Sequence, residues 1–304
     1  MKLIAPAYYP QFSCIAGKCR HSCCVGWEID IDEETAEAYR TFPGAIGARM
    51  QKCIDFDAEP PHFILQGKEE RCPFLNDRGL CDIILTCGED ALCQICTDHP
   101  RFRNFYSDRT EIGLGLCCEA AASLVLGYEA PAALICLTDD DLPDALTAEE
   151  QSYFALRDTL LALLQDRTRP FAARLTEVLA QVGGVRFSDL RAWGDFLLQL
   201  EILDSAWEVH LADIGAERAE LPGHAAEQLC VYLLTRHLPK MLDGEDAAVL
   251  VSFAVLAYDL ISALYARSET RDFASLCELV RLFSSEIEYS EENLYAIFDE
   301  IASS

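Results

Sequence analysis

The cysteines constrain this chain most, because twelve of its fifteen stand before position 120 of 304 residues. Thiolates a few residues apart can reach one metal, since a tight loop brings their sulfurs together. One cysteine cluster is weak evidence, but four within about a hundred residues indicate metal binding rather than incidental core cysteines. The four groups are Cys14, Cys19, Cys23 and Cys24; Cys72 and Cys81; Cys93 and Cys96; and the adjacent Cys117 and Cys118.

The first ten residues lack the continuous apolar segment of a secretory signal. We therefore expect a cytoplasmic location, where thiols stay reduced, and metal ligation rather than disulfides. The spacing favours an iron–sulfur cluster, because the first group is irregular and contains an adjacent pair. Zinc remains the alternative, since Cys93 and Cys96 have the Cys-x-x-Cys form of a zinc knuckle. One cluster needs four ligands, so two sites or spare thiols stay open.

The other candidate ligands have simpler explanations. His99 follows Cys96 by three residues, and a packed loop histidine is favoured over a ligand or proton donor. The isolated cysteines are interpreted as packing residues: Cys53, Cys87, Cys136, Cys230 and Cys277.

The formal net charge of −27 argues against nucleic acid as a partner, because phosphate binding needs clustered Lys and Arg. The charge is uneven. Residues 1–120 carry 12 basic and 19 acidic side chains, and residues 121–304 carry 12 and 32. A solvated acidic surface is the favoured interpretation, and attraction to a basic partner is compatible with it.

These shifts divide the chain into a Cys-rich metal domain (1–128), a linker (129–146) and an acidic helical domain (147–304). We expect a mainly α protein, with an irregular Cys-rich amino-terminal domain containing a few short strands and then an all-α helical bundle. Strands are predicted at 27–31, 62–66 and 110–116, a helical turn at 32–39 and a helix at 119–127. Such short strands and helices bury little apolar surface, so the metal is expected to supply folding energy.

The carboxy-terminal half shows helical periodicity. Thr147 is predicted to cap a helix, with Glu150 completing a capping box. Further helices are predicted at 170–182, 188–211, 223–239, 245–266, 270–284 and 290–301. Residues 247–266 are long and apolar enough to cross a membrane, but Asp259 would lie near mid-bilayer. We therefore predict a buried central helix and no membrane span.

The cysteine pattern resembles the flagellin lysine-N-methylase family through about residue 125. The matching elements are Cys14-x₄-Cys19-x₃-Cys23-Cys24-x-Gly26-Trp27, Arg71-Cys72-Pro73-Phe74-Leu75, Gly79-Leu80-Cys81, Leu92-Cys93-x-x-Cys96-x-x-His99-Pro100-Arg101 and Cys117 before Glu119-Ala120. The resemblance implies methyl transfer from S-adenosylmethionine to flagellin lysines, with a [4Fe-4S] cluster. It maps the family's cysteines onto Cys14, Cys19, Cys23, Cys24, Cys72, Cys81, Cys93, Cys96 and Cys117. Cys118 stands where the family has proline, so it is not among them.

The residues alone leave the chemistry open. A lysine must lose its proton before it attacks a methyl group, because its reference pKa is about 10.4. The sequence does not single out a general base or a donor site, since it lacks the Gly-x-Gly-x-x-Gly of a Rossmann methyltransferase. It also lacks the Cys-x₃-Cys-x₂-Cys of radical enzymes. The alternatives are a non-catalytic zinc or iron–sulfur module, and a redox sensor that uses Cys93 and Cys96.

Overall fold

The computed structural model describes residues 2–139, 145–212 and 214–304, which form a mixed α/β fold. The chain folds into two compact units. We call Ser13–Arg101 the cysteine-rich unit, and Met1–Phe12 with Phe102–Ser304 the helical unit. This division differs from the ranges 1–128, 129–146 and 147–304, because the first strand of the chain pairs with strands that follow residue 108.

The cysteine-rich unit consists of short elements around a small core that includes Tyr39, Met50 and Phe74. Asp32 caps the first helix by accepting from Thr35 N (2.9 Å), and its other oxygen accepts from Gln94 N (2.9 Å). One carboxylate therefore fixes both helix starts. The elements are η2 (Ala16–Lys18), α1 (Glu33–Arg40), α2 (Gly44–Cys53), β2 (Ile54–Asp55), β3 (His62–Phe63), α3 (Asp82–Cys87), η3 (Glu89–Ala91) and α4 (Gln94–Asp98).

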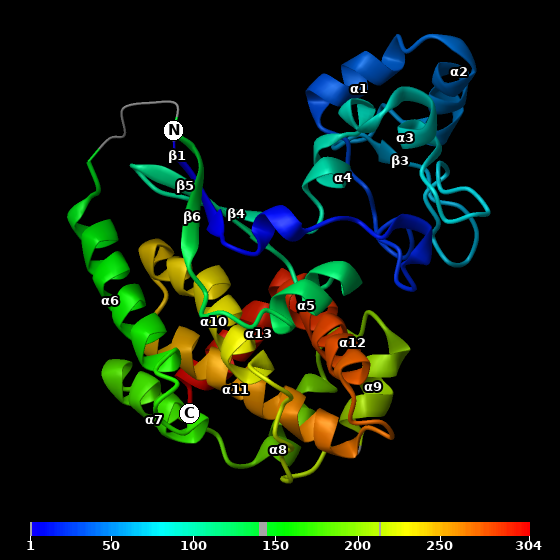
Figure 1. Cartoon of the computed structure of the whole chain (residues 1–304). Helices are drawn as coiled ribbons and strands as arrows, with labels where there is room; N and C mark the ends of the chain where they lie inside the picture. The colour runs from blue at the N-terminus through cyan, green and yellow to red at the C-terminus, as the bar shows by residue number, and fades with distance from the viewer. Residues whose placement is uncertain (1, 140–144, 213) are drawn as a thin grey trace. The chain divides into compact units, whose positions relative to one another are not determined.

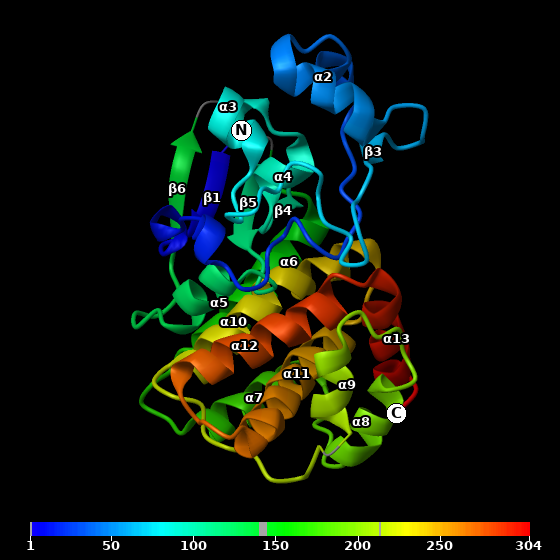
Figure 2. The ribbon, with the colours of Figure 1, turned by 90° about the vertical axis from the view of Figure 1, so that its right-hand side faces the viewer.

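A four-stranded sheet belongs to the helical unit and has the order β4-β5-β1-β6 (Figure 2). Its strands are β1 (Lys2–Pro6), β4 (Arg101–Phe105), β5 (Arg109–Leu114) and β6 (Leu134–Asp139). The strand predicted at 110–116 is β5. β1 runs parallel to β5 and antiparallel to β6. β6 lies within the predicted linker, so that stretch is partly sheet, while residues 140–144 of it lie outside the described residues.

Helices make up the rest of this unit (Figure 1). The predicted capping box is confirmed, because Thr147 accepts from Glu150 N and the Glu150 carboxylate accepts from Thr147 N. A 3-10 helix, η1 (Tyr9–Gln11), follows β1. The other elements are α5 (Glu119–Leu126), α6 (Ala148–Leu164), α7 (Phe171–Val182), α8 (Leu190–Leu197), α9 (Ser205–Leu211), α10 (Ala225–His237), η4 (Leu238–Asp243), α11 (Ala247–Arg267), α12 (Phe273–Phe283), the π-helical η5 (Ser284–Glu288) and α13 (Glu291–Ala302).

Two local predictions are wrong. The single helix predicted at 188–211 is broken into α8 and α9. The reason is tertiary: the buried Glu286 carboxylate accepts the backbone N–H groups of Leu203 and Asp204, so these groups bond a side chain instead of continuing the helix. The strand predicted at 27–31 forms only a bridge, in which Asp30 pairs with His62.

The apolar α11 is a buried central helix, as predicted. It is long and apolar enough to cross a membrane, but 83% of its most apolar window is buried inside the protein. It packs against α7, α10, α12 and α13. Its one acid, Asp259, accepts from two nitrogens of the Arg186 guanidinium, Nε (2.8 Å) and Nη2 (2.7 Å), and lies 3.0 Å from Arg218 Nε. The charge is thus compensated by arginines.

Candidate metal centre

Two distant segments bring Cys24 and Cys72 together in the cysteine-rich unit. The backbone N–H of Cys72 donates to the carbonyl of Cys24 (2.8 Å), and Val25 pairs with Arg71 in an antiparallel bridge. The two side chains are close enough for each thiol to shift the pKa of the other. Backbone pairing therefore brings together two cysteines that are 48 residues apart in the sequence.

A second pair of thiols lies at the start of α4. Cys93 is the residue before the helix and Cys96 lies within it, so that each thiol shifts the pKa of the other. Cys81 stands at the start of α3. Burial raises the pKa of Cys81, the contact with Cys93 and burial raise that of Cys96, and the negative charge of Cys24 raises both further. We call Cys24, Cys72, Cys81, Cys93 and Cys96 the thiol cluster.

Two cysteines of the thiol cluster, Cys24 and Cys93, have a lowered pKa. Hydrogen bonds from the Cys23 and Cys72 thiols lower the pKa of Cys24 to about 3. The Cys96 thiol likewise lowers the pKa of Cys93, while the pKa of Cys96 is raised by the same contact and by burial. In each pair, the cysteine with the lower pKa thus accepts a hydrogen bond from the protonated thiol of the other. Thiolates are the form in which cysteine binds metals.

Apolar and aromatic side chains surround these sulfurs. Cys72 and Cys93 are buried in a core with Phe74 and Ile83. The His99 ring lies 5.9 Å from the Trp27 ring, and burial lowers the pKa of His99 to about 4. The favoured interpretation of His99, a histidine packed by the domain, agrees with this position.

The other predicted ligands occupy different places. Cys14 is exposed, and its sulfur accepts from Ala16 N (3.3 Å). The Cys19 thiol donates to the carbonyl of His21 (3.2 Å), and Cys23 is tied to the thiol cluster through Cys24. Cys117 lies in the helical unit, where burial raises the pKa of its thiol to about 12. The ligand role of all nine cysteines stays a prediction.

Of the five cysteines interpreted as packing residues, two are buried, two are half-buried and one is exposed. Cys230 and Cys277 lie in the core of the helical unit, and Cys53 packs against the core of the cysteine-rich unit. Cys87 is half-buried, whereas Cys136 is exposed and donates to the carbonyl of Thr138 (3.2 Å). The packing interpretation therefore does not extend to Cys136.

The thiol cluster has the donor chemistry of an iron–sulfur site. Within the described ranges, no three His, Cys, Asp or Glu side chains are arranged to hold a single metal ion. Five thiols of one unit, two of them buried and three half-buried, are nevertheless the soft ligand set that iron–sulfur clusters require. The residues therefore fit the group by type, and all five lie in or pack against one core.

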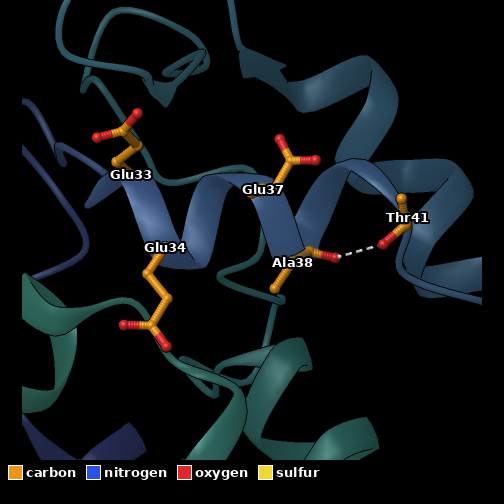
Figure 3. A pocket seen from close by; sticks show the side chains of 5 residues that line it. All are labelled: Glu33, Glu34, Glu37, Ala38 and Thr41. Atoms are coloured by element: carbon orange, nitrogen blue, oxygen red, sulfur yellow. Dashed lines mark hydrogen bonds between the residues drawn. The ribbon is translucent and has the colours of Figure 1, made fainter.

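An acidic depression lies on α1 and has a different character (Figure 3). Glu33, Glu34 and Glu37 line it together with Ala38 and Thr41. The Thr41 hydroxyl is near the carbonyl of Ala38, at 3.5 Å. Its lining offers carboxylates and no aromatic ring, so nothing there resembles a pocket for an adenine-bearing donor.

Comparison with known proteins adds a family relationship. The lysine-N-methylases of Salmonella typhimurium and Salmonella choleraesuis are each 30% identical to this chain over 134 residues. The flagellar biosynthetic protein FliU of Salmonella muenchen is 26% identical over 172 residues. The chain is a distant homologue of these proteins. No family model and no solved structure matches it.

The coverage of these matches differs. The match to the two lysine-N-methylases covers 40% of this chain and 31% of each relative, so the chain spans about a third of their length. The match to FliU covers 55% of this chain and 93% of FliU.

Proposed function

We propose that this protein is a protein-lysine N-methyltransferase that transfers a methyl group from S-adenosylmethionine to lysines of flagellin. The observation that carries the proposal is the homology to the Salmonella lysine-N-methylases, together with the relationship to FliU, a flagellar biosynthetic protein. The cytoplasmic location predicted from the sequence fits this activity, because reduced thiols persist there.

We propose further that the activity depends on a [4Fe-4S] cluster held by the thiol cluster. Four of the five thiols suffice for one cluster, and the pairs Cys24–Cys72 and Cys93–Cys96 supply two ligands each. Cys81 is then the spare thiol beside them. When bound, such a cluster supplies thiolate-ligated iron, which can hold a donor or stabilise the fold.

The protein's own residues have two tasks in this reaction. They must desolvate or deprotonate the acceptor lysine, because an ammonium has no lone pair for attack. They must also hold the amine in line with the methyl–sulfur bond of the donor, since positioning lowers the barrier substantially. The acidic surface of residues 121–304 favours the approach of lysine-bearing proteins.

The test is methyl transfer itself. Protein purified and reconstituted without oxygen is incubated with flagellin and methyl-labelled S-adenosylmethionine, and labelled lysines are located by mass spectrometry. We expect label on flagellin lysines, and little with Cys24→Ser. A protein that holds iron and sulfide yet transfers no label would instead be the non-catalytic module that the cysteine pattern alone permits.

A further inference from the structure

Cys24 and Cys72 lie opposite each other where two segments of the cysteine-rich unit pair in antiparallel fashion. Val25 is paired with Arg71, and beside this pair Cys72 N donates to the carbonyl of Cys24 (2.8 Å). Residues opposite each other in such a pairing send their side chains to the same side of the two segments. The two cysteine side chains therefore project into the same space from neighbouring backbones.

Local hydrogen bonds hold each of these two segments. Cys24 N donates to the Ser22 hydroxyl (3.3 Å). On the other segment, the backbone groups of Gln66 and Arg71 exchange two hydrogen bonds, of 2.8 and 2.9 Å, and close a hairpin that ends beside Cys72. The opposition of the two cysteines is thus set by hydrogen bonds of the protein itself.

The spacing at this position suits a disulfide. Opposite residues joined by backbone hydrogen bonds have Cα atoms about 5.5 Å apart. Disulfides join residues whose Cα atoms are about 4.4 to 6.8 Å apart. A bond between the sulfurs of Cys24 and Cys72 therefore requires little backbone movement.

We propose that, in the metal-free protein, a peroxide joins Cys24 to Cys72 in a disulfide that closes the thiol cluster to iron until a thiol reduces it. This inference rests on the proposed function, because the same thiols are the ligands of the proposed [4Fe-4S] cluster. It adds a form of regulation by oxidants that the cluster alone does not supply.

The reaction with hydrogen peroxide has two steps. Cys24 is half-buried and Cys72 is buried, so the peroxide reaches Cys24 first. The Cys24 thiolate attacks one peroxide oxygen, the O–O bond breaks, and a sulfenic acid and hydroxide form. The Cys72 thiolate then attacks the Cys24 sulfur, and the S–O bond breaks with loss of a second hydroxide. The two hydroxides take up the two thiol protons as water, and the two sulfurs lose two electrons to the peroxide.

The disulfide removes two ligands from the thiol cluster. Cys81, Cys93 and Cys96 remain, and a [4Fe-4S] cluster needs four ligands. A thiol reductant reverses the change, because its thiolate attacks one disulfide sulfur and its second thiol then releases the protein as a dithiol.

Peptide mapping of the full chain, depleted of metal, tests the disulfide. The protein is treated with hydrogen peroxide, free thiols are alkylated, and tryptic peptides are identified by mass spectrometry. We expect residues 21–40 to be joined to residues 72–78 with the loss of two hydrogens. The first peptide carries both Cys23 and Cys24, so the link should persist in Cys23→Ser. Cys87→Ser is the matched control from the same unit and should also keep the link.

Cluster assembly tests the closure of the site. Ferrous iron and stoichiometric sulfide are added without oxygen, and assembly is followed by visible absorbance. The initial rate should be at least about tenfold lower in peroxide-treated protein than in untreated protein, because three thiols do not complete the cluster. Treatment with dithiothreitol, which is then removed, should restore the rate.

The outcomes separate this inference from the proposed function. If the untreated, reduced protein assembles no cluster, the proposed cluster fails and this inference fails with it. If that protein assembles a cluster but peroxide leaves Cys24 and Cys72 free, only this inference is overturned. A disulfide between Cys93 and Cys96 in place of the expected one overturns it too. So does an unchanged assembly rate in protein that carries the expected disulfide.

Discussion

At the scale of single residues, contacts between distant side chains were only partly predictable. The spacing of Cys93 and Cys96 indicates a pair, because three residues of helix start bring the sulfurs together. The partnership of Cys24 with Cys72 follows only from backbone pairing between two segments. The buried contacts of Glu288 left no signal in the sequence, since its partners Tyr232, Arg236 and His237 lie in α10, more than 50 residues before it, and each residue type is common.

Substitution of the thiols tests their assignment. Cys24→Ser and Cys96→Ser should each lose most bound iron, because serine is a poor ligand for a thiophilic cluster. Cys87→Ser is the matched control, since Cys87 is half-buried in the same unit and is not among the predicted ligands. Iron per chain, measured on proteins purified without oxygen, decides the point. Equal iron in all three variants would contradict the assignment.

Acid should destabilise the helical unit through His237. Burial lowers the pKa of His237 in the folded state, so between that value and the unfolded pKa of about 6.5 the unfolded chain binds the extra proton. The facing groups are Glu288, Arg236 and Lys240. The free energy of unfolding should therefore fall as pH drops below about 6.5.

Urea unfolding between pH 7 and pH 5 measures this dependence. His237→Asn should make the curve of unfolding free energy against pH shallower, although the variant is less stable at pH 7 because Glu288 loses a partner. His224→Asn, at the start of α10, should keep the wild-type slope, because His237 is intact in it. An unchanged slope in His237→Asn would rule out this origin of acid sensitivity.

At the scale of elements, local signals predicted what local contacts determine. The start of α6 follows from Thr147 and Glu150, which are close in sequence. The division of 188–211 into α8 and α9 depends on Glu286, which lies about 80 residues away. β1 was not predicted for the same reason, because its five residues form a strand only by pairing with β5 and β6.

The cap of α6 gives a prediction at this scale. Thr147→Ala should lower the free energy of unfolding by about 1 kcal/mol, because Glu150 N loses its acceptor. Thr159→Ala removes the same atoms from the exposed middle of the helix, where the hydroxyl donates to the carbonyl of Ala155. Its cost should stay within about 0.5 kcal/mol. Equal losses in the two variants, measured by urea unfolding, would contradict the capping account.

At the scale of the whole molecule, the two units should depend differently on bound metal. The core of the cysteine-rich unit is small and includes cysteines, whereas the helical unit has a large apolar core around α11. Removing the metal should therefore accelerate hydrogen exchange within residues 13–101 and leave α11 protected. Exchange measured by mass spectrometry on metal-loaded and metal-depleted protein tests this. Uniform acceleration of both units would contradict it.

The central claim is that thiols from separated segments hold an iron–sulfur cluster. The most direct measurement is iron and acid-labile sulfide analysis, with a visible spectrum, on protein purified without oxygen. We predict about four irons and four sulfides per chain and an absorbance that reductant bleaches. A colourless protein that contains zinc, or neither metal, would contradict the claim.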